Sequence, residues 1–348
     1  MLNKIIAMVC GLVFINGSAL FAAQPSQDLM ADSKFRVFIG QFQKLMKSTQ
    51  QVSLDEARRQ STAFFCPPEL SRESVHKVTD IKVTSQEGHE IPIRLYYPTP
   101  SKNLPIIIYY HRGGWVFSNI EEADPVCRKL ANHLGCIIAS VDYRLAPENP
   151  FPKPLNDCYD AFCWIAEHGA ELGSDAGKVI VCGESVGGNL AAAVALRARD
   201  SQGPALAAQL LIYPVISATF NEKAYKESAD QHFLTKEAMQ FFWSMYLQNP
   251  ADAKNEYASL DQASSLKNLP PALIVTAEHD PLHVEAEKYA EMLEKAGNHV
   301  ILEKYPGVVH GFLDLPIYSD DEIVSWINRI GECLKKVEIL KSLGTGGK

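Results

Sequence analysis

Residues 183–187 read Gly-Glu-Ser-Val-Gly, and the types and spacing of these residues suit Ser185 for nucleophilic chemistry. The G-x-S-x-G pattern is typical of a sharp turn between a strand and a helix, which presents the serine hydroxyl above a sheet. The pattern is weak by itself, but here an apolar run precedes it and an alanine-rich run follows it. The sequence therefore predicts that Ser185 is a nucleophile.

Two residues further along the chain could activate this serine. A serine hydroxyl is a poor nucleophile until a base takes its proton, and a carboxylate then stabilises the protonated base. With this kind of turn, the carboxylate follows the serine in the chain and the histidine comes last. Asp280 and His310 fit that order, and each follows an apolar run that predicts a strand. Glu278 is the alternative acid.

Glycines after another apolar run could bind the negative charge that develops when a serine attacks a carbonyl group. Residues 111–115 read His-Arg-Gly-Gly-Trp. A glycine loop can turn backbone N–H groups inward, and such preformed donors stabilise a tetrahedral intermediate. The predicted donors are the N–H groups of Gly113, Gly114 and Val186, the last of which directly follows the serine.

Together these motifs make the sequence similar to the hormone-sensitive lipase-like family of α/β-hydrolases, whose bacterial members are carboxylesterases. The resemblance extends over residues 75–335, and it rests on the runs at 111–114, 142–148, 183–191, 280–282 and 310–312. It implies a catalytic triad of Ser185, Asp280 and His310. It also implies an oxyanion hole formed by the amides of Gly113, Gly114 and Val186.

The sequence departs from the family pattern at two positions. Arg112 stands where the family has the first glycine of its His-Gly-Gly-Gly loop, and Val186 replaces the usual alanine. Because that glycine is not one of the implied donors, we expect the oxyanion hole to persist and Arg112 to constrain the loop or contact an acidic group. In the run at 142–148, we interpret Asp142 and Arg144 as a structural ion pair that anchors a loop.

Short apolar runs alternate along the chain with segments of helical periodicity, and this alternation predicts a parallel sheet covered by helices on both faces. The predicted strands are residues 78–84, 91–97, 105–110, 136–141, 179–182, 208–213, 272–276 and 300–305. The predicted helices between them include residues 124–134, 156–168, 188–199 and 284–296. With the resemblance, this predicts an α/β-hydrolase fold with a mostly parallel central sheet of about eight strands and a helical cap.

The first 23 residues have the order of a secretory signal peptide. Lys4 precedes an apolar stretch at residues 5–15, and the small residues Ala22 and Ala23 follow. The stretch is about eleven residues long, whereas a transmembrane helix needs about 20. We therefore expect a periplasmic or secreted protein with no stable membrane insertion after signal removal. A cytoplasmic protein with an uncleaved N-terminal helix is the alternative.

The remaining chain is predicted to form one catalytic unit with a discontinuous cap. Residues 24–75 contain two segments with spaced apolar positions, which predict helices. Residues 216–266 lack a strong strand and are rich in aromatic side chains. We expect N-terminal cap helices at 24–75 and an α/β-hydrolase catalytic domain at 76–348 that carries a cap insertion at 216–266.

The composition is that of a globular protein with a large core. The 348 residues are 47% hydrophobic and carry a net charge of −8, which provides no basic field for binding nucleic acid. Eight cysteines are too few for a disulfide scaffold, and we interpret most of them as core residues. No C-x-x-C motif is present, and Pro281 lies between His279 and His283, so we expect no metal site.

The predicted function is that of a serine carboxylesterase that needs no cofactor and hydrolyses short- to medium-chain acyl esters of small molecules through an acyl-enzyme. Trp115, Phe117 and Phe312 are expected to line the substrate pocket with the cap aromatics. A peptidase or acyltransferase on the same fold is the alternative, and a non-catalytic ligand receptor is a further one. The sequence leaves open the alcohol group of the substrate and whether the chain forms a homodimer.

Overall fold

The computed structural model describes residues 33–49, 51–220, 222–227 and 233–336, so the predicted signal peptide at 1–23 lies outside the described residues. The described chain contains an eight-stranded sheet in the order β1-β2-β4-β3-β5-β6-β7-β8. Strand β2 is antiparallel to β1 and β4, and the other neighbours are parallel, which confirms the predicted fold class. The strands are β1 (Lys77–Thr84), β2 (Glu90–Tyr97), β3 (Leu104–Tyr110), β4 (Ile137–Val141), β5 (Ser174–Glu184), β6 (Ala208–Ile212), β7 (Ala272–His279) and β8 (Val300–Val309).

Alternate residues of the central strands pack into two cores, one on each face of the sheet. In β3, Ile106 and Ile108 belong to one core, whereas Ile107 and Tyr109 belong to the other. Every residue of this strand is buried. The strand can therefore be apolar along its whole length, because neither of its faces meets water.

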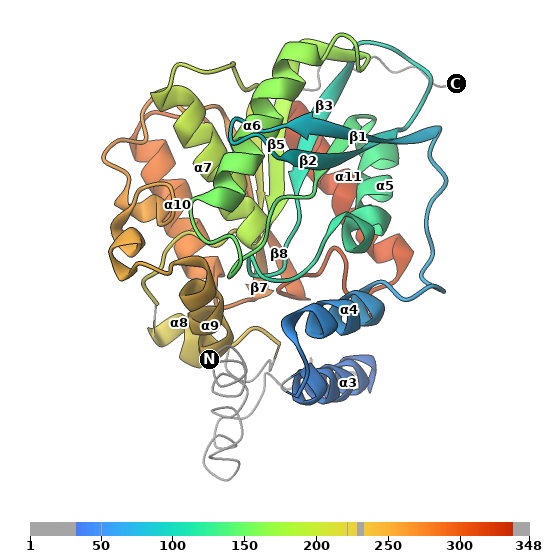
Figure 1. Ribbon diagram of the computed structural model, residues 1–348, viewed down its shortest axis with the longest axis vertical. Helices are drawn as coiled ribbons and strands as arrows, with labels where there is room; N and C mark the ends of the chain where they lie inside the picture. The colour runs from blue at the N-terminus through green and yellow to red at the C-terminus, as the bar shows by residue number, and fades with distance from the viewer. Residues whose placement is uncertain (1–32, 50, 221, 228–232, 337–348) are drawn as a thin grey trace.

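Helices cover both faces of the sheet (Figure 1). Helices α6, α7 and α10 complete the first core, and α5 and α11 complete the second. Helix α5 begins where the side chain of Asn119 accepts hydrogen bonds from two backbone N–H groups, and it ends at Gly135, which has a φ of 65°. These helices are α5 (Ile120–Leu134), α6 (Lys153–His168), α7 (Val186–Asp200), α10 (His283–Lys295) and α11 (Asp320–Lys336).

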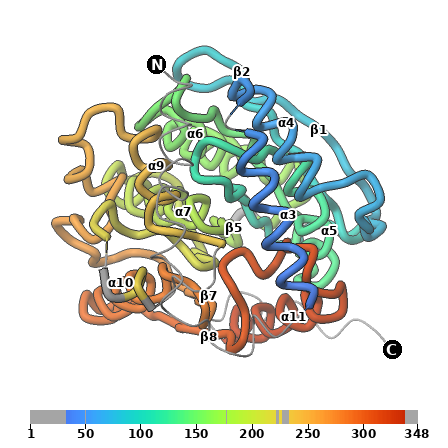
Figure 2. The backbone as a smooth tube through the Cα atoms, turned by 90° about the horizontal axis from the view of Figure 1, so that it is seen from below, coloured from blue at the N-terminus to red at the C-terminus, as the bar shows by residue number. Residues whose placement is uncertain are grey.

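The remaining helices lie near the carboxyl ends of the central strands. Figure 2 shows α3 (Ser33–Thr49) beside α4 (Leu54–Phe65) across this end of the molecule. In the segment between β6 and β7, the described residues form two α-helices and two short 3-10 turns. Phe38 of α3 packs against Phe233 of this segment, with ring centroids 5.6 Å apart. The helices of the segment are α8 (Glu222–Glu227) and α9 (Lys236–Tyr246), with the short turns η3 (Pro250–Lys254) and η4 (Leu260–Gln262).

All seven cysteines in the described residues are unpaired thiols, and six of them are buried. This agrees with their interpretation as small core residues. No helix within the described ranges has the length and apolar character needed to cross a bilayer.

Candidate active site

Ser185 lies at a sharp turn between β5 and α7. Its backbone φ is 56°, in the left-handed region that residues with a side chain rarely occupy. The flanking glycines are required by space, because a Cβ on Gly183 would lie 2.1 Å from the Gly187 oxygen, and one on Gly187 would lie 1.9 Å from the Tyr110 oxygen. The Ser185 N–H donates to the Ile212 carbonyl at 2.9 Å, which holds the turn against β6. The turn predicted from the glycine spacing is therefore present.

Two hydrogen bonds connect the three residues predicted to act together. His310 Nε2 lies 2.9 Å from Ser185 Oγ, and His310 Nδ1 lies 2.7 Å from Asp280 Oδ2. A carboxylate that only accepts hydrogen bonds suits the tautomer in which Nδ1 carries the ring proton, and in that tautomer Nε2 can accept from the serine hydroxyl. All three residues are buried. In this arrangement the histidine can take the serine proton while the carboxylate fixes its orientation.

Of the two candidate acids, Asp280 is the one that contacts His310. Its second oxygen, Oδ1, accepts from the Leu282 N–H at 2.9 Å, which fixes the carboxylate at the start of the turn before α10. Glu278 is exposed and accepts instead from the Gly307 N–H at 2.7 Å. Glu278 therefore supports the backbone of β8 rather than the histidine.

The three predicted oxyanion donors line the same cavity as Ser185 and His310. Gly113 and Gly114 have φ values of 111° and 66°, and Val186 is the first residue of α7. Within the described chain, none of their three backbone N–H groups donates to a protein acceptor. Free N–H groups beside the serine are what a developing oxyanion needs.

His111 holds the glycine loop from behind. Its ring stacks on Tyr143 with centroids 4.2 Å apart, and the Tyr143 hydroxyl donates to the His111 carbonyl at 2.7 Å. Burial lowers the pKa of His111 to about 4. The ring is therefore neutral near pH 7, and its role is to anchor the loop.

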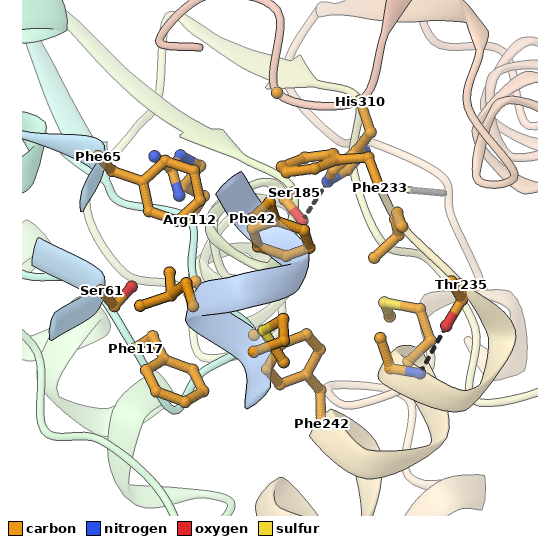
Figure 3. A pocket seen from close by; sticks show the side chains of 18 of the residues that line it. Phe42, Ser61, Phe65, Arg112, Phe117, Ser185, Phe233, Thr235, Phe242 and His310 are labelled. Carbon is orange, nitrogen blue, oxygen red and sulfur yellow. Dashed lines mark hydrogen bonds between the residues drawn. The ribbon is translucent and has the colours of Figure 1, made fainter. Parts of the chain in front are cut away.

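A cavity of about 230 Å³ opens above Ser185. Figure 3 shows Phe42, Phe117 and Phe242 around the serine, with His310 on the other side. The wall is mostly apolar, and α3, α4 and α9 supply much of it. The side chains of these helices that line it are Phe42, Gln43, Leu45, Met46, Thr49, Ser61, Phe65, Ala238, Met239 and Phe242.

Of the three side chains expected to line this pocket, only Phe117 does so. The expectation for Trp115 is wrong, because the loop turns after Gly114 and buries this ring against Tyr246, with centroids 4.2 Å apart. The expectation for Phe312 is also wrong. Its ring lies in the second core against Trp326, with centroids 5.0 Å apart.

The cap aromatics were expected at the pocket, but the sequence did not identify which residues of α3 would reach it. Phe35, Phe38 and Ile39 are buried in a core between the helices, whereas Phe42 and Met46 face the cavity. The apolar stripe of α3 thus continues past the positions that are buried against other helices. This continuation is the sequence signal that could have indicated that α3 also lines the cavity.

The loop at 142–148 is anchored differently from the predicted pair. Arg144 binds the buried Asp157 at 2.7 Å rather than Asp142. Asp142 instead accepts from the Ile120 N–H at 3.3 Å, at the start of α5. Both side chains are structural, but each has a partner from another element. The described residues contain no cluster of three or more His, Cys, Asp or Glu side chains that could hold a metal ion.

Comparison with known proteins agrees with this geometry. A sequence model of the α/β hydrolase fold matches residues 107–314, a range that contains the serine turn, Asp280 and His310. The chain belongs to this α/β-hydrolase family. This confirms the family that the motifs indicated.

Several relatives are named as esterases or ester hydrolases. The carboxylesterase NlhH of Mycobacterium tuberculosis is 37% identical over 270 residues, which cover 76% of this chain and 83% of the relative. The ethyl acetate hydrolase of Pseudomonas putida is 35% identical over 265 residues, 74% of this chain and 83% of the relative. An esterase structure from Pyrobaculum calidifontis has a TM-score of 0.77 and 38% identity, and the match covers 83% of this chain and 94% of that one.

Proposed function

We propose that this protein is a serine carboxylesterase in which Ser185, His310 and Asp280 form the catalytic triad. The observation that carries the proposal is the pair of hydrogen bonds, 2.9 and 2.7 Å long, that joins these side chains at the floor of an apolar cavity. The esterase names of the relatives support the same reaction class. A carboxylic ester hydrolase is thus the enzyme class that both kinds of observation favour.

In the first half of the reaction, His310 Nε2 takes the proton of Ser185 as Oγ attacks the ester carbonyl carbon. The carbonyl oxygen becomes an oxyanion, and the N–H groups of Gly113, Gly114 and Val186 donate to it. Asp280 stabilises the imidazolium. The bond between the carbonyl carbon and the alkoxy oxygen then breaks, and His310 returns its proton to the departing alcohol.

In the second half, a water molecule takes the place of the alcohol. His310 removes a proton from this water as it attacks the acyl carbon, and the same three amides hold the second oxyanion. Collapse of that intermediate releases the carboxylic acid and returns the proton to Ser185 Oγ. Every proton in the cycle passes through His310 Nε2, so the reaction needs no cofactor.

The cavity favours small, neutral esters. Its volume of about 230 Å³ lies below the usual range of roughly 300–1,000 Å³ for sites that enclose drug-sized ligands. Its wall offers aromatic and aliphatic side chains. Among the described residues that line it, Arg112 is the one Lys, Arg, Asp or Glu, and it is already paired with carboxylates. Short- to medium-chain acyl groups therefore suit this site.

The test compares Ser185→Ala with the wild type on p-nitrophenyl acetate and butyrate. We expect turnover to fall by at least about 1,000-fold, because the nucleophile is lost while the oxyanion donors remain. Ser140→Ala provides a matched control, since Ser140 is a buried serine in β4. A fluorophosphonate probe should label the wild type and Ser140→Ala but not Ser185→Ala. Full turnover by Ser185→Ala would refute the proposal.

Further assays of the wild-type enzyme distinguish an esterase from the alternative functions on this fold. Amide substrates with the same acyl groups test for a peptidase, and an added alcohol acceptor tests for an acyltransferase. We expect hydrolysis of the ester to exceed both reactions. A wild type that the fluorophosphonate probe does not label would favour a non-catalytic ligand receptor.

We further propose that residues 1–23 are a cleaved signal peptide and that the enzyme acts outside the cytoplasm. The support is the order of Lys4, the apolar stretch at 5–15 and the small residues at 22–23. Mass spectrometry of the protein isolated from its cell fractions tests this directly. A protein that retains Met1 or Leu2 in the cytoplasm would contradict it.

A further inference from the structure

Arg112 is a buried arginine directly before the two glycines of the proposed oxyanion hole. Only 12% of its side chain is exposed. Its Nε donates to Asp314 Oδ2, and a second guanidinium nitrogen lies 3.1 Å from Glu122 Oε1. The guanidinium also lies over the Phe65 ring, 4.5 Å from its centroid. The expectation that Arg112 contacts an acidic group is thus met twice.

The partners of Arg112 come from three separate elements. Asp314 lies four residues after His310, in the segment that follows β8. Glu122 lies in the first turn of α5, and Phe65 ends α4. One side chain therefore joins the glycine loop, the histidine loop, a helix of the second core and a helix of the cavity wall.

This connection spans most of the sheet. Strands β5, β6 and β7 separate β3, which leads into the glycine loop, from β8, which leads into the histidine loop. Among the described residues, no backbone hydrogen bond joins the two loops. The pair of Arg112 and Asp314 is thus a direct polar link between the proposed oxyanion donors and the proposed general base.

Stability alone does not account for these buried charges. Taking an arginine and two carboxylates out of water is costly, and such groups are often no more stabilising than apolar side chains of similar size. What the arrangement provides is geometry, because the planar guanidinium fixes the direction of each partner. Glycine allows more backbone conformations than any other residue type, so an anchor at position 112 restricts where the N–H groups of the two glycines beside it point.

We propose that Arg112 is a positioning residue that holds the N–H groups of Gly113 and Gly114 in register with Ser185 and His310, through its contacts with Asp314 and Glu122. The proposal rests on the esterase function proposed above. It assigns a role to the residue at which this sequence departs from the His-Gly-Gly-Gly pattern. Arg112 does not touch the reacting atoms, so its effect must act through the two amides.

The experiment uses Arg112→Lys, which keeps the charge but loses the planar fork, and Asp314→Asn, which keeps the shape but loses the charge. Three quantities are measured: kcat per fluorophosphonate-titrated site, KM, and the inhibition constant of a trifluoromethyl ketone that forms an oxyanion on Ser185. We expect kcat to fall by about tenfold to a hundredfold and the inhibition constant to rise in parallel, with little change in KM.

Arg144→Lys is the matched control, since Arg144 is also a mostly buried arginine paired with a buried carboxylate, Asp157. It should lower the melting temperature without changing kcat per titrated site. The positioning role would be wrong if Arg112→Lys and Asp314→Asn lowered only the melting temperature and left both kcat and the inhibition constant of the ketone unchanged. Arg112 would then have a structural role alone. If Arg112→Lys does not fold, Asp314→Asn alone decides. A wild type without turnover would instead overturn the esterase proposal.

Discussion

Asp280 and His310 are 30 positions apart in the chain, yet the parallel pairing of β7 with β8 brings them together. The ladder pairs His279 with Val309. Asp280 directly follows the end of β7, and His310 directly follows the end of β8. Their side chains therefore meet, with Asp280 Oδ2 and His310 Nδ1 2.7 Å apart. A shift of one residue in this register would separate the two side chains.

Asp280→Asn should lower kcat by about 10,000-fold, because an amide can no longer hold His310 in the tautomer that accepts the serine proton. Glu278→Gln is the control, since Glu278 is exposed and contacts the Gly307 N–H rather than the histidine. We expect it to keep most of the activity. Steady-state kinetics on p-nitrophenyl butyrate decides between the two acids, and a large loss in Glu278→Gln with little loss in Asp280→Asn would reverse the assignment.

Gly114→Ala should lower kcat by about 100-fold, because the new Cβ would lie 2.1 Å from a ring carbon of Phe242, so that either the ring or the loop must shift, and because a φ of 66° is unfavourable for alanine. Gly88→Ala separates this effect from backbone strain. Gly88 also has a positive φ, 86°, but a Cβ there meets no atom within 4 Å. That variant should lose about 1 kcal/mol of stability and keep its kcat. Equal kcat values in the two variants would argue against the loop as an oxyanion site.

Much of the sheet and the central residues of the site follow from local patterns. The run at 105–110 predicted a doubly covered strand, and β3 (Leu104–Tyr110) is buried on both faces. Ser185, Asp280 and His310 each follow an apolar run, and the carboxyl ends of parallel strands meet at one edge of a sheet. For these residues, the position in the chain was enough to predict that the side chains come together.

Contacts between distant elements could not be predicted in this way. Nothing in the local pattern distinguishes Trp115, which is buried beneath α9, from Phe117, which reaches the cavity. The partner of Arg144 is likewise Asp157 in α6, 13 positions away, rather than the nearer Asp142. Each outcome depends on how a loop packs against a helix, and residue spacing carries no information on that packing.

Phe242→Ala should extend the range of esters toward longer acyl chains, because the Phe242 ring lines the cavity and its removal leaves space there. We expect kcat/KM for octanoate and decanoate esters to rise relative to the acetate ester. Phe241→Ala is the control, since the neighbouring Phe241 is buried in the first core. It should lower the melting temperature without changing the chain-length profile. The same profile shift in both variants would point to general loosening rather than to the wall.

Glu184 is a buried carboxyl group directly before the proposed nucleophile. It accepts a hydrogen bond from the Tyr109 hydroxyl at 2.6 Å and another from the Tyr213 hydroxyl. Burial, reinforced by the nearby Asp314 carboxylate, raises the pKa of Glu184 from 4.5 to about 7, although the two tyrosines oppose this shift. The folded protein therefore retains a proton on this side chain under conditions in which the unfolded chain has released it.

This shift predicts how stability depends on pH. Between pH 4.5 and 7 the folded state binds more protons at Glu184 than the unfolded state, so this residue lowers the free energy of unfolding as pH rises through that window. Glu184→Gln removes this contribution. Between pH 4.5 and 7, the free energy of unfolding of the variant should therefore fall less than that of the wild type, and the difference between the two losses should be up to about 3 kcal/mol. Urea denaturation at several pH values measures this. Glu291→Gln is the control, because the Glu291 side chain on α10 is 65% exposed, and its stability should depend on pH as that of the wild type does. If the free energy of unfolding depends on pH in the same way in all three proteins, Glu184 is ionised in the folded state throughout the window.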